Sequence, residues 1–127
     1  MKFPYNPRLY PPAPYVEIWL GIPDESLKLG PLQALVDTGS DATILPYRLI
    51  RPLRLQIDDR KFLRSPWGAR HRVDIFLLDI DIAGGRLPVA EVVADTQGDE
   101  VIVGRNVLNM LRVILDGPKR LLEIQDL

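Results

Sequence analysis

The stretch that decides the fold is Ala34-Leu35-Val36-Asp37-Thr38-Gly39-Ser40-Asp41-Ala42-Thr43-Ile44-Leu45. Its apolar start is typical of a buried strand and leads directly to the carboxylate of Asp37 in a tight turn. Glycine at position 39 lets the backbone approach a neighbour where a side chain would block it. Such a carboxylate can activate water when its surroundings tune its pKa, most directly through a second carboxylate about 3 Å away.

A second motif begins near the C-terminus, and its glycine, Gly104, lies 67 positions after Asp37. It reads Val101-Ile102-Val103-Gly104-Arg105-Asn106-Val107-Leu108, a short apolar strand and a glycine before a helical pattern. Asp-Thr-Gly alone is weak evidence for an active site, because a three-residue motif often occurs by chance. The pattern becomes specific through three additions, which are the apolar residues before it, the Ser-Asp after it and the second motif.

The two motifs together resemble those of the retropepsin-like aspartic proteases, over about residues 15–125. The resemblance implies an all-β fold, a closed retropepsin-like barrel with one short C-terminal helix. It implies one catalytic aspartate per subunit and therefore a homodimer with the active site on its two-fold axis. The expected activity is that of an aspartic endopeptidase, with water activated between two Asp37 carboxylates, one from each subunit.

Peptide or protein is the substrate that the resemblance implies, and no metal or organic cofactor is expected. Because the apparent pKa values of the two carboxylates belong to the pair, activity is expected at acidic to mildly acidic pH. A catalytically inactive peptide-binding or interaction module on the same fold is the alternative. The oligomeric state separates the two, since a strict monomer favours the binding module.

The active-site loop has four residues with roles that the resemblance implies. Asp37 is the catalytic carboxylate, and Thr38 hydrogen-bonds across the dimer axis. Gly39 places backbone near the substrate, and Ser40 supports the loop.

Three further residues are expected to connect this loop to the second motif. The resemblance implies that Asp41 forms a structural ion pair with Arg105 of the same chain. It also implies that Gly104 packs tightly behind the active-site loop.

The flap that covers the substrate is expected over residues 60–74. Pro66, Trp67 and Gly68 lie near its tip and are candidate substrate-binding residues. This flap is basic and contains Pro66 and Trp67, whereas retroviral enzymes have a glycine-rich tip. Retroviral enzymes have one short strand after the helix, whereas here a second strand pattern follows at 121–124. This resembles the retropepsin domain of the DNA-damage-inducible ubiquitin-shuttle proteins, or a lobe of pepsin.

Composition restricts the alternatives. The chain has 127 residues, enough for one domain, with 46% hydrophobic and 26% charged residues. It has no cysteine and one histidine, His71, which excludes disulfides, thiolate metal sites and a multi-histidine zinc site within one chain. The catalytic chemistry that remains for a single chain is mainly that of carboxylates. No signal peptide or membrane-spanning run is visible, so a cytoplasmic protein without membrane partners is expected.

Charge is unevenly distributed along the chain. The formal net charge is −1, but residues 46–72 carry +6 and the remainder −7. A solvated basic face is the simplest interpretation. An electrostatic footprint for an acidic partner or a nucleic acid is the alternative. Aromatic residues do not alternate with these arginines in the sequence, so nucleic acid is not favoured as a partner.

Residues 1–14 are expected to form a proline-rich N-terminal arm, and residues 15–127 the protease domain. Asp116-Gly117-Pro118-Lys119 predicts a hairpin turn, and Asp79 and Asp81 are expected to be exposed on one strand face. The remaining expectations are a helical turn at 46–50, a helical segment at 106–111, and strands at 15–20, 32–36, 53–57, 73–82, 87–94, 101–103, 112–115 and 121–124.

Overall fold

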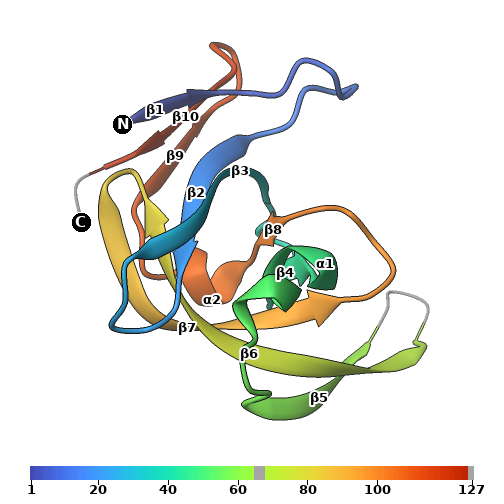
Figure 1. The fold of residues 1–127 in the computed structure, drawn as a ribbon. Helices are drawn as coiled ribbons and strands as arrows, with labels where there is room; N and C mark the ends of the chain where they lie inside the picture. Colours follow the sequence, from blue (N-terminus) through green and yellow to red (C-terminus); the bar gives the residue numbers. More distant parts are fainter. Residues whose placement is uncertain (65–67, 126–127) are drawn as a thin grey trace.

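The computed structural model describes residues 1–64 and 68–125, and strands dominate it (Figure 1). This confirms the all-β prediction. The first strands are β1 (Lys2–Pro4), β2 (Tyr15–Gly21), β3 (Leu27–Val36) and β4 (Thr43–Pro46), followed by α1 (Tyr47–Ile50) and the 3-10 helix η1 (Arg51–Leu53). The remaining elements are β5 (Asp59–Arg64), β6 (Arg70–Ile82), β7 (Gly85–Asp95), β8 (Ile102–Val103), α2 (Arg105–Leu108), β9 (Val113–Asp116) and β10 (Leu121–Ile124).

The main sheet has seven strands in the order β2-β3-β8-β4-β7-β6-β5. A further pairing between β2 and β6 brings the sheet back toward its own beginning. The sheet therefore curls around the core into a barrel (Figure 1). The barrel is only partly closed, because the short β8 joins β4 through a single residue pair, Ile44 with Ile102.

Strand β2 shows how the sequence pattern creates the core. Val16, Ile18 and Leu20 are at most 1% exposed, whereas Glu17 and Trp19 between them are exposed. Side chains alternate between the two faces of a strand, so one face of β2 lies inside the barrel. The central core includes Leu45, Leu78, Ile80, Val92, Val103 and Val107, each fully or almost fully buried.

Within the proline-rich residues 1–14, strand β1 forms the edge of a second sheet with the order β1-β10-β9, and the chain then turns back so that Asn6 pairs with Ala13. The amino group of Met1 donates to the Ile124 carbonyl at 2.8 Å, and the Ile124 amide donates to the Met1 carbonyl at 2.9 Å. The predicted C-terminal hairpin is confirmed as β9 and β10. The two ends of the chain therefore stabilise each other (Figure 1).

The strand predicted at residues 53–57 is wrong. Leu53 ends η1, and Arg54 has a left-handed φ of 52° while its amide donates to the Arg51 carbonyl at 3.1 Å. Pro52 at the start of this turn favours helical geometry over the short period-two pattern. Strand β5 begins only at Asp59, whereas the helical turn predicted at 46–50 is confirmed by α1.

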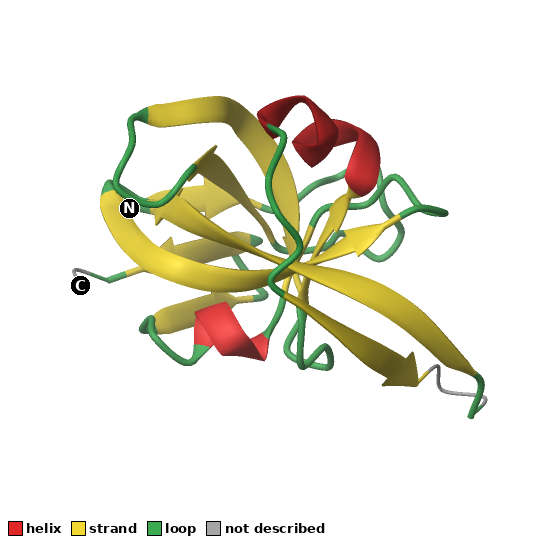
Figure 2. Cartoon of the chain, turned by 60° about the horizontal axis from the view of Figure 1, so that its bottom comes forward, coloured by secondary structure: helices red, strands yellow, loops and turns green. Residues whose placement is uncertain are grey.

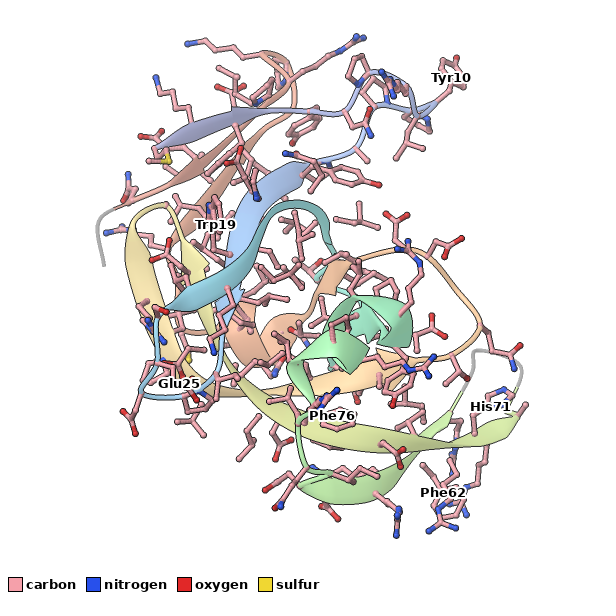
Figure 3. All side chains as sticks on the ribbon, in the orientation of Figure 1. Tyr10, Trp19, Glu25, Phe62, His71 and Phe76 are labelled. Atoms are coloured by element: carbon pink, nitrogen blue, oxygen red, sulfur yellow. The ribbon has the colours of Figure 1, made fainter. Side chains whose placement is uncertain are left out.

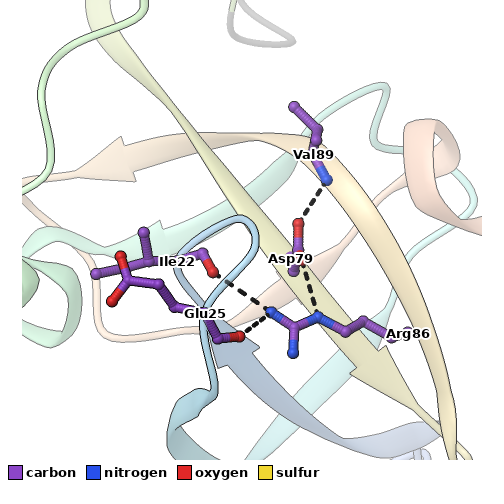
Figure 4. A network of polar contacts seen from close by, with 5 residues as sticks. All are labelled: Ile22, Glu25, Asp79, Arg86 and Val89. Atoms are coloured by element: carbon purple, nitrogen blue, oxygen red, sulfur yellow. Dashed lines mark hydrogen bonds and ion pairs between the residues drawn. The ribbon is translucent and has the colours of Figure 1, made fainter.

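The prediction that Asp79 is exposed is also wrong, because the residue is 5% exposed. A register shift between Leu78 and Ile80 interrupts the alternation of β6, so Asp79 and its neighbours on both sides are buried. The carboxylate accepts hydrogen bonds from Arg86 Nε and from the Val89 amide, each at 2.8 Å (Figure 4).

Within the described residues, no helix is long and apolar enough to cross a membrane.

Candidate active site

The Asp37 loop leaves the end of β3 beside β8. The Asp37 amide donates to the Val103 carbonyl at 3.1 Å, which extends the parallel pairing of Val36 with Val103. Asp37 Oδ1 accepts the Gly39 amide at 2.9 Å, and the Ser40 amide donates to the Asp37 carbonyl at 3.2 Å. The loop is therefore fixed by its own backbone, and it holds a half-buried carboxylate at the protein surface.

Gly104 lies directly behind this loop. A Cβ at position 104 would come within 2.1 Å of the Ala42 carbonyl oxygen and 3.0 Å of the Ser40 carbonyl oxygen. Both neighbours are backbone atoms that a side-chain rotation cannot move away. Close contact between the two motifs therefore requires glycine at this position.

Arg105 connects the two motifs in a way that differs from the prediction. Its amide donates to the Ser40 carbonyl at 2.8 Å, and its guanidinium donates from Nη1 to the Thr38 carbonyl at 2.8 Å. The predicted ion pair with Asp41 is not among those formed between described residues. The guanidinium reaches loop backbone instead, and Asp41 remains exposed.

A buried threonine adds a link that sequence reasoning missed. Thr43 is fully buried, and its hydroxyl donates to Asn106 Oδ1 at 2.8 Å while accepting the Gly104 amide at 3.1 Å. Asn106 Nδ2 in turn donates to the Glu91 carbonyl at 2.9 Å on β7. Asn106 of the second motif was the one sequence feature that could have indicated this link, because a side-chain amide can donate and accept hydrogen bonds at once.

The outer side of the loop is open. Thr38 and Gly39 are exposed, and the Thr38 hydroxyl has no hydrogen-bond partner among the described residues. Ser40 Oγ donates to the Ala42 carbonyl at 2.7 Å, so this hydroxyl stabilises the loop internally.

The predicted flap is a hairpin of β5 and β6, with Arg60 opposite Asp74 and Arg64 opposite Arg70. It projects from the body of the protein (Figure 2). Pro66 and Trp67 lie outside the described residues. Gly68 is exposed at a φ of +84°, a conformation that suits glycine.

Two cavities lie between this hairpin and the barrel. The larger, of 580 Å³, is lined by Leu63, His71 and Val73 of the hairpin and by Ile44 and Val93 of the barrel, among others. A smaller cavity of 190 Å³ includes residues 41 and 42, directly after the Asp37 loop, together with 61–63 of the hairpin. The hairpin and the Asp37 loop therefore share one region of the surface. No three metal-ligating side chains come together within residues 1–64 and 68–125.

Comparisons with solved structures identify this architecture. A retropepsin-like aspartic protease from Rickettsia conorii has a TM-score of 0.65 and 16% sequence identity, over 98% of this chain and 90% of that one. The retroviral protease-like domain of Ddi1 from Leishmania major has a TM-score of 0.55 and 20% identity, over 91% and 90% of the two chains. The chain has the retropepsin-like fold.

The EIAV protease shares the retropepsin-like fold at a TM-score of 0.54 and 17% identity, over 77% of this chain and 86% of that one. No protein-family model matches the sequence, and no curated protein sequence is significantly similar to it. At these identities the comparisons establish the fold, and the chemistry of the site is a separate question.

Proposed function

We propose that this protein is an aspartic endopeptidase that acts as a homodimer. The observation that carries the proposal is the position of Asp37 within the retropepsin-like fold. The residues behind the loop fix its backbone through Gly104 and Arg105, while the carboxylate side stays open. A carboxylate held rigidly at an open surface suits catalysis better than stabilisation of the fold.

The mechanism needs two such carboxylates. When two Asp37 side chains lie close together, both cannot ionise, and they share one proton. The ionised carboxylate takes a proton from water as the water attacks the peptide carbonyl carbon. The protonated carboxylic acid then gives its proton to the carbonyl oxygen, which produces a tetrahedral diol. Collapse of this intermediate breaks the C–N bond, with proton transfer to the leaving amine.

One chain supplies only half of this site, because its sequence has a single Asp-Thr-Gly. A two-fold axis next to the loop brings in the second Asp37. The exposed Thr38 hydroxyl, which has no partner among the described residues, supports an interface at this position. Loss of the shared proton above the upper apparent pKa ends activity, so the enzyme is expected to work at acidic to mildly acidic pH.

The test is peptide-library cleavage across pH by the wild-type protein and by Asp37→Asn, together with the mass in solution. We expect cleavage by the wild type, no cleavage by the variant, and a particle of about twice 14.4 kDa. Cleavage retained by Asp37→Asn would falsify this mechanism. A strict monomer that binds peptides without cleaving them would instead support an inactive binding module.

A further inference from the structure

The outer half of the β5–β6 hairpin has a concentration of positive charge that the proposed mechanism does not use. At its base, Arg60 pairs with Asp74 at 3.5 Å, and Lys61 pairs with Glu91 of β7 at 3.0 Å. Beyond these pairs the hairpin has no acidic residue, since residues 61–73 contain none. Ion pairs between described residues include neither Arg64, Arg70 nor Arg72.

The strand register places these arginines together. Arg64 lies directly opposite Arg70, and Arg72 lies opposite Phe62, so the four side chains belong to one face of the hairpin. Like charges directly opposite each other destabilise a sheet. Phe62 is 67% exposed, and Figure 3 shows it near the outer end of the hairpin. This face therefore combines uncompensated cations with an exposed aromatic ring, which the linear sequence did not reveal.

The positive charge reaches the larger cavity. Arg72 lines it together with Leu63, His71 and Val73, whose side chains belong to the other face of the hairpin. Its apolar walls can take a hydrophobic side chain, while the arginine stands beside it. Two opposing charges also line it. Asp74 pairs with Arg60, and Asp95 on the barrel side accepts the Gln97 amide through Oδ1 at 2.8 Å.

We propose that the polypeptide substrate is acidic on either side of a hydrophobic residue that enters this cavity. The inference rests on the proposed function and adds the substrate class to it. Guanidinium groups pair with carboxylates through charge-assisted hydrogen bonds, and Arg72 is placed to do so. Arg64 and Arg70 act at longer range, because a cluster of one sign attracts a polyanionic chain before contact.

The experiment uses three peptides with the same hydrophobic core, flanked by glutamate, glutamine or lysine. We expect wild-type kcat/KM to be about tenfold higher for the glutamate peptide than for the lysine peptide at low salt. Arg70→Gln/Arg72→Gln should reduce this ratio to within about twofold. The control Arg8→Gln/Arg112→Gln removes the same charge from exposed positions outside the hairpin and should retain the ratio. Asp95→Asn should raise it.

Binding of the same labelled peptides to Asp37→Asn, followed by fluorescence anisotropy, separates this proposal from the proposed function. Tighter binding of the glutamate peptide that depends on Arg70 and Arg72 supports the substrate class even when no peptide is cleaved. Equal cleavage or binding of the three peptides overturns it and leaves the protease mechanism intact. No binding of any peptide, or tighter binding of a single-stranded oligonucleotide at equal charge, also overturns it.

Discussion

Two aspartates of this fold, Asp79 and Asp37, have opposite surroundings. Asp79 is buried, with both carboxylate oxygens occupied by Arg86 and the Val89 amide. Arg86 also donates from Nη2 to the carbonyls of Ile22 and Glu25, so the pair connects β6, β7 and the loop after β2 (Figure 4). Burial opposes ionisation of Asp79, but these hydrogen bonds and the guanidinium charge lower its pKa below the ordinary value.

Asp37 has the reverse arrangement. Its side chain accepts one local hydrogen bond, from the Gly39 amide. The surrounding backbone is fixed by hydrogen bonds to β8 and Arg105. No cation pairs with it among the described residues. Asp79 is therefore a carboxylate that stabilises the fold, whereas Asp37 is one that the fold presents at the surface.

The largest expected effect is the loss of activity in Asp37→Asn, by at least about a thousandfold in kcat. The free energy of unfolding should stay within about 0.5 kcal/mol of wild type, because the asparagine side-chain oxygen can still accept the hydrogen bond from the Gly39 amide. Peptide cleavage and urea unfolding measure the two quantities. A large fall in the free energy of unfolding alongside the loss of activity would mean that Asp37 has a structural role.

Gly104→Ala should lower the free energy of unfolding by about 3 kcal/mol or more, because the new methyl group meets the Ala42 carbonyl. Gly117→Ala is the matched control, since a Cβ there meets nothing within 4 Å. Urea unfolding of the two variants checks the prediction. Equal stability of both would contradict the close contact between the motifs.

Asp79→Asn should cost about 2–3 kcal/mol, because it leaves Arg86 without its carboxylate. Asp81→Asn on the same strand should have little effect, since Asp81 forms no ion pair with a described residue. Thermal or urea unfolding measures both. The stabilisation by Asp79 is complete above its ordinary pKa and disappears as pH falls through the lowered value. The difference between wild type and Asp79→Asn should therefore shrink at low pH.

The smallest effect concerns Tyr15, whose hydroxyl donates to Glu100 Oε1. Burial, followed by the hydrogen bond and charge of Glu100, raises the pKa of Tyr15 to about 12. The neutral phenol is favoured in the folded state, so its stabilisation is present below the ordinary pKa and is lost as pH rises toward 12. Ultraviolet titration should show one late tyrosine that disappears in Tyr15→Phe. Unchanged titration would contradict the assignment.

The two motifs sufficed to predict the fold, because together they resemble those of the retropepsin-like aspartic proteases. In the structure the motifs meet where β3 pairs with β8. The partner of Arg105 could not be predicted, since a carboxylate and a backbone carbonyl within reach compete for the same donor. The burial of Asp79 depends on a register shift in β6 that no local pattern indicates. The basic face of the hairpin depends on cross-strand pairing, which places Phe62 opposite Arg72.

The most direct test of the central claim mixes wild-type and Asp37→Asn subunits. Co-refolded mixtures at constant total protein should lose activity as the square of the wild-type fraction, if both carboxylates of a dimer are required. An equal mixture should then retain about a quarter of the wild-type rate. A linear dependence, with about half of the rate retained, would contradict a site built from two Asp37 side chains.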